Sequence, residues 1–178
     1  MGQRFIMTAF GQDRPGIVAD VTEILFENGC NLEDTSMTLL AGEFTLILLF
    51  MAGSADVTSP LSRACRRLEQ EKGISAFLRP LEPRETVKTE ISCFTRTLHV
   101  EGLDQAGIVF KVSRFLADNR INIVNLKSAV KASPESGTAM YVMDILAQIP
   151  TGTAMDSLEN GLRTVADDLN VDITLSEN

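Results

Sequence analysis

The chain has 178 residues, of which 44% are hydrophobic, and it carries 16 basic and 24 acidic side chains, for a formal net charge of -8. No basic run of the kind that neutralises phosphates along a duplex is present, so direct nucleic-acid binding is disfavoured. No apolar stretch approaches the roughly 20 residues of a membrane-spanning helix, and no secretory leader precedes the first strand-like segment. We therefore expect a soluble, cytoplasmic protein that binds neither nucleic acid nor membrane directly.

Cysteine and histidine usage argues against a metal site and against nucleophilic catalysis. Cys30, Cys65 and Cys93 are odd in number, lack CxxC spacing and have no neighbouring histidine, so we expect them to be reduced and partly buried. The single histidine, His99, lies in an alternating run and is expected to be a strand residue in ordinary packing. We expect no metal, no cofactor and no enzymatic activity.

The sequence repeats itself once. The segment 10–37 returns in altered form at 101–128. The offset is 91 residues for each of three shared pairs: Asp13 and Asp104 (104 minus 13), Gly16 and Gly107 (107 minus 16), and Asn31 and Asn122 (122 minus 31). Long-period similarity of this kind predicts duplicated structural units. We predict two domains, at 1–83 and 91–178, joined by the polar, proline-containing segment 82–90.

The first copy predicts strands at 4–10, 31–40, 44–52 and 74–81, with Gly11 breaking the first of them. Its first helix has an apolar stripe and ends at Gly29; the stripe comprises Ile17, Val18, Val21, Ile24 and Leu25. Its second helix is expected to be capped by Ser59 and to have Pro60 at its first position. The inner face of that helix should contain Leu61, Ala64, Cys65 and Leu68.

The second copy predicts the same order, with strands at 96–102, 121–131, 138–147 and 171–175, a helix at 107–119 and a turn at 134–137. Its last helix has an apolar residue every three or four positions, and Thr153 with Asp156 resembles a capping box. The apolar residues are Met155, Leu158, Leu162, Val165 and Leu169. The fold class is therefore α+β: two ferredoxin-like βαββαβ domains, each a four-stranded antiparallel sheet with two helices on one face.

The third strand of the first copy is apolar on both faces. Phe44, Leu46, Leu48 and Phe50 point to one side, and Ile47, Leu49 and Met51 point to the other. At about 25 cal/mol per Å² of apolar surface, leaving the second set in water would forfeit several kcal/mol. We therefore expect a second sheet or another protomer to cover the helix-free face.

The repeated turn Gly-x-Asp-x-x-Gly follows the first strand of each copy. One interpretation is structural: Asp13 accepts from the N–H of Gly16 as a helix N-cap, and Asp104 does the same with Gly107. The other is functional, because a helix start with unpaired N–H donors and a glycine favours a small carboxylate. We expect the second-strand start to lie beside this turn, so that Asn31 and Asp34 accept from the ammonium of an amino acid. The spacing matches neither a P-loop nor a dinucleotide-binding loop.

These residues resemble ACT domains, and the tandem pair is similar to the glycine cleavage system transcriptional repressor family, with likeness over about 4–81 and 96–175. The "DRPGIVA" of the first copy is a specific match; the second copy departs from it with Gln105 and Ala106, and with Asn125 in place of Asp34. The resemblance implies that an amino acid binds between paired ACT units. The implied contacts are Asp13, Arg14, Pro15, Gly16, Ile17, Asn31, Leu32 and Asp34 in copy one, and Asp104, Gly107, Ile108, Asn122, Ile123 and Asn125 in copy two.

The function implied is allosteric regulation of amino-acid metabolism. We expect a homodimer that binds a small, glycine-like amino acid and represses transcription by contacting a DNA-binding protein rather than DNA. Two alternatives stay open on the sequence: a regulatory subunit of an amino-acid metabolic enzyme, and a ligand-free oligomerisation scaffold.

Overall fold

The computed structural model describes residues 2–53, 57–82, 92–133 and 137–177. Its contacts divide the chain into two compact units, Met1–Val87 and Lys88–Asn178. Apart from Glu82, the predicted linker 82–90 lies outside the described residues, as does most of the predicted turn at 134–137. Each unit is described by itself below. In the described part of the chain, no helix is long and apolar enough to span a bilayer.

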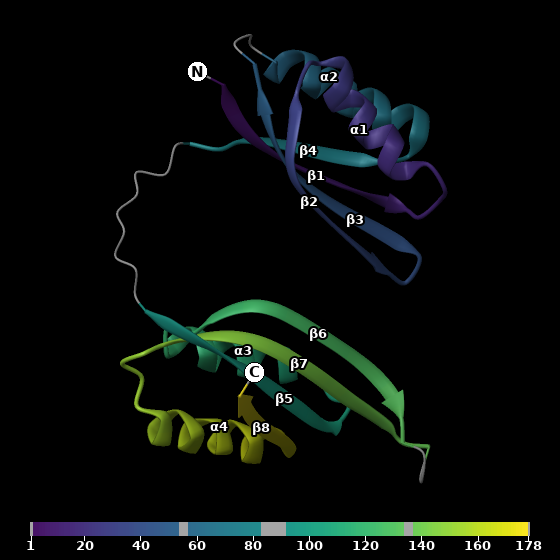
Figure 1. Ribbon diagram of the computed structural model, residues 1–178. Helices are drawn as coiled ribbons and strands as arrows, with labels where there is room; N and C mark the ends of the chain where they lie inside the picture. Colours follow the sequence, from purple (N-terminus) through teal and green to yellow (C-terminus); the bar gives the residue numbers. More distant parts are fainter. Residues whose placement is uncertain (1, 54–56, 83–91, 134–136, 178) are drawn as a thin grey trace. The chain divides into compact units, whose positions relative to one another are not determined.

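Unit 1 has the predicted order βαββαβ: β1 (Gln3–Gln12), α1 (Ile17–Glu27), β2 (Asn31–Leu40), β3 (Glu43–Ala52), α2 (Thr58–Lys72) and β4 (Ser75–Pro80). Its strands form an antiparallel sheet in the order β2-β3-β1-β4. Both helices lie on the same face of this sheet (Figure 1).

Unit 2 repeats the arrangement with β5 (Cys93–Leu103), α3 (Ile108–Asp118), β6 (Asn122–Ala132), β7 (Ala139–Pro150), α4 (Met155–Leu169) and β8 (Val171–Glu177). The strand order is β6-β7-β5-β8, which is the order of unit 1. The fold class is confirmed: two ferredoxin-like βαββαβ folds, each with its helices on one face of a four-stranded antiparallel sheet.

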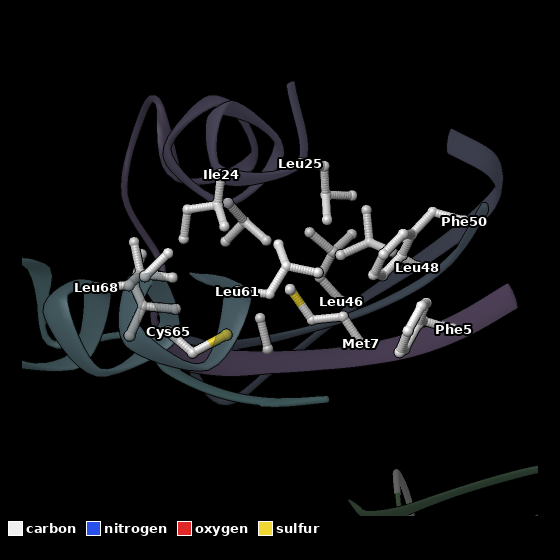
Figure 2. Close-up of a cluster of buried hydrophobic side chains, with 14 of the residues drawn as sticks. Phe5, Met7, Ile24, Leu25, Leu46, Leu48, Phe50, Leu61, Cys65 and Leu68 are labelled. Atoms are coloured by element: carbon white, nitrogen blue, oxygen red, sulfur yellow. The ribbon is translucent and has the colours of Figure 1, made fainter. Parts of the chain in front are cut away.

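The core of unit 1 lies between the sheet and its helices. Alternation along β3 places Phe44, Leu46, Leu48 and Phe50 inward, where each is at most 1% exposed. All four predicted residues of α2, including Cys65 and Leu68, are buried against them (Figure 2). The rings of Phe5 and Phe50 stack with centroids 5.6 Å apart. In unit 2, Leu158, Leu162 and Leu169 of α4 are buried in the equivalent core.

Several predicted details of the helices are wrong by one or two residues. α2 begins at Thr58 with Val57 as N-cap and no side-chain cap, so Ser59 is not the cap and Pro60 is the third helical residue. α4 has Ala154 as N-cap, also without a side-chain cap, so Thr153 and Asp156 form no capping box. Helix ends depend on tertiary contacts that sequence periodicity does not encode. Val18 is 41% exposed, because it lies at the edge of the apolar stripe and not on the part of the helix that faces the core.

β1 continues through Gly11 instead of ending there. A Cβ built on Gly11 would lie 2.9 Å from the carbonyl oxygen of Gly73, so the missing side chain allows the start of β4 to approach. Gly102 holds the equivalent position in β5, where a Cβ would lie 2.5 Å from Cγ1 of Val171. Glycine inside these strands marks a close backbone approach rather than a break.

Candidate functional site

The turn after β1 is shaped by Gly16. This residue is the N-cap of α1 at φ 88° and ψ -4°, in the left-handed region that favours glycine. A Cβ built on it would meet nothing within 4 Å. Gly107 repeats the geometry before α3, at φ 99°, and is open in the same way. Both repeated glycines therefore stand at an accessible helix start.

The predicted N-cap role of Asp13 and Asp104 is wrong. Neither α1 nor α3 has a side-chain cap, because a left-handed glycine occupies each N-cap position. Instead, the main-chain N–H of Asp13 donates to the carbonyl of Gly42 at 2.9 Å, and that of Asp104 donates to Ala139 at 3.2 Å. These bonds tie each turn to the adjacent hairpin. Both aspartates are exposed.

The start of α1 presents open main-chain donors. The N–H of Ile17 donates to the carbonyl of Arg14 at 3.3 Å. Within the described residues, the N–H groups of Gly16, Val18 and Ala19 donate to no protein acceptor. The N-terminal end of a helix dipole adds partial positive charge at this point. The arrangement can therefore hold a carboxylate.

Arg14 and Ile17 have structural roles in this turn. Nη2 of Arg14 donates to Oδ2 of Asp20 at 2.5 Å, and Nζ of Lys72 lies 3.6 Å from the other carboxylate oxygen. The hydrogen bond from Arg14 holds the pKa of Asp20 below its ordinary value. Ile17 is 2% exposed, so it faces the core and leaves only its main chain at the turn, beside the exposed Pro15.

The turn of unit 2 is tied to its own fold by different contacts. Nε2 of Gln105 donates to the carbonyl of Leu169 at the end of α4, and Nζ of Lys111 donates to Oδ2 of Asp168 at 2.5 Å. Ile108, like Ile17, is buried. Gln105 thus connects the turn to the last helix, a contact that Arg14 does not make in unit 1.

The second-strand start does not lie beside the turn of its own unit, contrary to the prediction. Both β1 and β2 are antiparallel to β3, so they run parallel to each other. Asn31 pairs with Met51 at one end of β3, whereas Gln12, just before the turn, pairs with Glu43 at the other end. Eight residues of strand separate these ends, or about 26 Å. α1 returns the chain to the end of the sheet from which β1 started, and α3 does the same in unit 2.

Both second-strand starts contain a register shift that sequence reasoning missed. The irregularity lies between Leu32 and Asp34 in β2 and between Ile123 and Asn125 in β6. In β2, Oδ1 of Asp34 accepts from the N–H of Thr35 at 2.8 Å.

The other predicted residues at these starts are accessible at least in part. Asn31 and Leu32 are exposed in β2, whereas in β6 Asn122 and Asn125 are exposed and Ile123 is half-buried. Nδ2 of Asn122 donates to Oε1 of Gln148 at 3.3 Å.

His99 is a strand residue of β5, as predicted, but it also contacts two carboxylates. It lies on the helix-free face of unit 2, 40% exposed, with Nδ1 2.6 Å from Oδ1 of Asp144 and Nε2 3.7 Å from Oε2 of Glu101. The hydrogen bond with Asp144 raises the pKa of His99 above its ordinary value. Period-two alternation could have placed Glu101 beside His99, but Asp144 is a cross-strand neighbour that only the register reveals.

The cysteines differ in exposure: Cys65 is buried and Cys30 is half-buried, but Cys93 is exposed, so the predicted burial is wrong for Cys93. Burial raises the pKa of the Cys65 and Cys30 thiols. Within the described segments, no group of three or more His, Cys, Asp or Glu side chains could hold a metal ion.

Comparison with known proteins places this geometry in a family. The ACT domain family model matches residues 3–78. The chain is 24% identical over 165 residues to the glycine cleavage system transcriptional repressor of Escherichia coli, covering 93% of this chain and 85% of that protein. It is 34% identical over 76 residues to a UPF0237 protein of Methanopyrus kandleri, covering 42% of this chain and 84% of that protein.

A solved structure shows the same tandem fold along the whole chain. A crystal structure of an unknown protein from Galdieria sulphuraria has a TM-score of 0.78 and 28% identity, covering 100% of this chain and 99% of that one. The family model matches unit 1, and unit 2 repeats its strand order and its glycine turn. The chain therefore belongs to the ACT domain family, as a tandem ACT protein that resembles the glycine cleavage system transcriptional repressor.

Proposed function

We propose that this chain is a ligand-sensing regulator of amino-acid metabolism, and that the glycine turn of unit 1 binds the carboxylate of a small amino acid such as glycine. The observation that carries the proposal is the open helix start at Gly16, whose neighbouring N–H groups of Val18 and Ala19 donate to no acceptor among the described residues. A small zwitterion fits because main-chain donors recognise the carboxylate and the missing Cβ of Gly16 leaves room for close approach.

The ammonium requires acceptors at the same place. Asp13, which is exposed and does not cap the helix, offers one carboxylate within the turn. The second-strand start, with Asn31, the carbonyl of Leu32 and Asp34, is about 26 Å away in its own unit. We propose that a second copy of the chain supplies these groups, so that the complete site belongs to a homodimer.

The two units are proposed to differ in affinity. The turn of unit 2 keeps Asp104, Gly107 and the main chain of Ile108, but Gln105 ties it to α4. Its second-strand start has Asn125 in place of Asp34, which removes a negative charge from the ammonium side. Unit 1 is therefore the tighter site, and the site with Asn122, Ile123 and Asn125 is the weaker one.

The output is proposed to be contact with a DNA-binding protein rather than catalysis or direct DNA binding. The net charge of -8 opposes binding to a polyanion. Burial raises the pKa values of the Cys30 and Cys65 thiols, so neither thiol resembles an activated nucleophile. Ligand binding would change affinity for the partner, and the partner must change ligand affinity by the same factor.

Calorimetric titration of the full chain with a panel of small amino acids tests the proposal. Wild-type protein should release or absorb heat with at least one of them, and Gly16→Ala should bind it at least tenfold more weakly, because the new Cβ enters the ligand's space. Gly73→Ala is the matched control, since Gly73 is also left-handed and open, at φ 68°, but lies at the C-terminus of α2. Equal affinity for both variants would contradict the assignment of the turn.

Co-purification tests the regulatory output. Full-length protein used as bait should retain a DNA-binding protein, and the amount retained should change when the bound amino acid is added. Retention of an amino-acid metabolic enzyme instead would favour the regulatory-subunit alternative. A folded chain that binds neither an amino acid nor a partner would leave only the scaffold alternative.

A further inference from the structure

The helix-free face of the unit 1 sheet carries an apolar patch, which Thr8 interrupts and Arg4 borders. Its members are Ile6, Phe10, Ile47, Leu49, Met51 and Phe77, which the strand register places on β1, β3 and β4. Phe10 is 43% exposed, Ile47 45% and Phe77 63%. The rings of Phe10 and Phe77 stack at 5.9 Å between centroids on this face. Both helices lie on the opposite face, so they leave this patch uncovered within the unit (Figure 1).

The fold does not require this patch, because unit 2 lacks it. The register gives the equivalent positions directly: Leu49 pairs with Ile6, and Leu146 pairs with Thr97. The six equivalents in unit 2 are Thr97, Glu101, Asp144, Leu146, Gln148 and Thr174. Only Leu146 is apolar. A sheet of the same order folds with a polar outer face, so the apolar residues of unit 1 serve something other than its own core.

Opposite charges stand at the two edges of the patch. Cross-strand pairs form one row across the sheet, from Asp34 on β2 through Leu49 and Ile6 to Arg79 on β4. Arg79 has no ion-pair partner among the described residues. The equivalent row of unit 2 ends in Asn125 and Ser176, which are uncharged. The charge pair is therefore present in the unit that has the patch and absent from the other.

This pattern is self-complementary. Consider two identical sheets that stack about a twofold axis parallel to their strands. Each cross-strand row then lies over the same row of the other copy, and the strand order is reversed, so that β2 of one copy lies over β4 of the other. Asp34 of each copy then faces Arg79 of its partner, once at each edge. Stacking about an axis across the strands would place β2 over β2 and leave both charges unmatched.

We propose that the helix-free face of unit 1 docks on the same face of a second copy of this chain. Because each row lies over the same row of the other copy, each turn remains about 26 Å from the partner's second-strand start, so this contact is distinct from the one proposed to complete the amino-acid site. The two sheets pack as an aligned sandwich about 10 Å apart, with the apolar patches in contact and two Asp34–Arg79 pairs at the edges. A sheet face of four strands, each about six residues long, has an area of about 400 Å² per copy. The total of about 800 Å² lies below the roughly 1,200 to 2,000 Å² of stable specific complexes, so the association is weak, reversible and dependent on concentration.

Sedimentation velocity of the full chain without ligand, over a wide concentration range, tests the proposal. Wild type should shift from monomer towards dimer or a larger assembly as concentration rises, and Leu49→Glu should weaken self-association at least tenfold. Leu146→Glu is the matched control at the equivalent, similarly half-buried position of unit 2, and it should leave the association unchanged. A wild type that stays monomeric, or equal effects of the two variants, would overturn the proposal.

A charge exchange tests the arrangement without disturbing the apolar patch. Asp34→Arg and Arg79→Asp should each weaken the association, because each places like charges opposite one another. The double variant D34R/R79D should recover most of the wild-type association. Failure of the double variant to recover, with circular dichroism showing all three variants folded, would contradict the twofold stacking. Because no amino acid is present, these outcomes do not depend on ligand binding.

Discussion

Gly16 and Gly107 each set the backbone path of a turn and leave its surface accessible. A left-handed residue costs an L-amino acid about 1 kcal/mol, and glycine avoids this cost. The sequence repeat identified both positions, since the two glycines share the offset of 91 with their neighbours. It could not identify how the turn is fixed, because an exposed aspartate three residues before a glycine is equally compatible with a cap and with the main-chain bond from Asp13 to Gly42.

His99 gives a direct measurement at the residue scale, because it is the only histidine in the chain. Its imidazole proton resonance, followed by NMR against pH, should titrate above the ordinary histidine pKa, since the hydrogen bond with Asp144 favours the charged form. Asp144→Asn should lower the pKa. An unchanged titration in this variant would contradict the His99–Asp144 contact.

The same contact makes the stability of unit 2 depend on pH. The folded-state pKa of His99 is raised above its unfolded value, so the folded state binds the proton more tightly. Its stabilising contribution should be complete below the ordinary histidine pKa and be lost as pH rises through the raised one. Urea unfolding at pH values on either side of this window measures it, with Asp144→Asn as the variant that should show a smaller difference.

At the scale of elements, the close approach of β5 to β8 depends on Gly102. Gly102→Ala should destabilise the chain by about 1 to 3 kcal/mol, because the new methyl group would overlap Val171 in the neighbouring strand. Urea unfolding measures the change. Gly152→Ala is the control, since a Cβ at Gly152 meets nothing within 4 Å, and it should be close to neutral. Equal effects of the two substitutions would contradict the close packing.

Helices and strands with a strong hydrophobic period could be predicted from the sequence. Their ends could not, where these depend on contacts with neighbouring elements. The limits of β2 are those predicted, and all four core residues of α2 are buried as the helical stripe indicates. The caps at Ser59 and Thr153 failed, because a serine or threonine near a helix start is a weak signal for one particular position.

The wrong prediction that the second strand starts beside the turn has a different cause, because the predicted βαββαβ topology is enough to exclude it. In a βαβ crossover the two strands are parallel, so the end of β1 and the start of β2 must lie at opposite ends of the sheet. The register that joins Asp34 to Arg79 across four strands, by contrast, depends on bulges and pairings that a single sequence does not reveal.

At the scale of the whole molecule, the two units share a fold and differ in surface chemistry. Both units have an open helix start, but Gln105 ties the turn of unit 2 to α4. Unit 1 has an apolar outer face, and unit 2 has a polar one around His99. This divergence supports separate roles, with ligand binding and self-association assigned to unit 1. The ACT domain family model matches residues 3–78, which lie in unit 1.

Mixing two defective chains tests whether the amino-acid site is shared between copies. Gly16→Ala impairs the turn half, and the double substitution Asn31→Ala with Asp34→Ala impairs the strand half, so each variant alone should lack the tight site of unit 1. After subunit exchange in an equal mixture, half of the dimers are mixed and each has one intact site, which restores about a quarter of wild-type sites. Calorimetry counts them. A mixture that stays inactive would contradict a site formed between copies.

The central claim is that the open helix start at Gly16 holds the carboxylate of a small amino acid. A crystal structure of the full chain grown with saturating glycine tests it most directly. The account predicts a carboxylate within about 2.7 to 3.2 Å of main-chain nitrogens among Gly16, Val18 and Ala19. Saturating glycine with an empty turn, or with the amino acid bound only elsewhere, would contradict it.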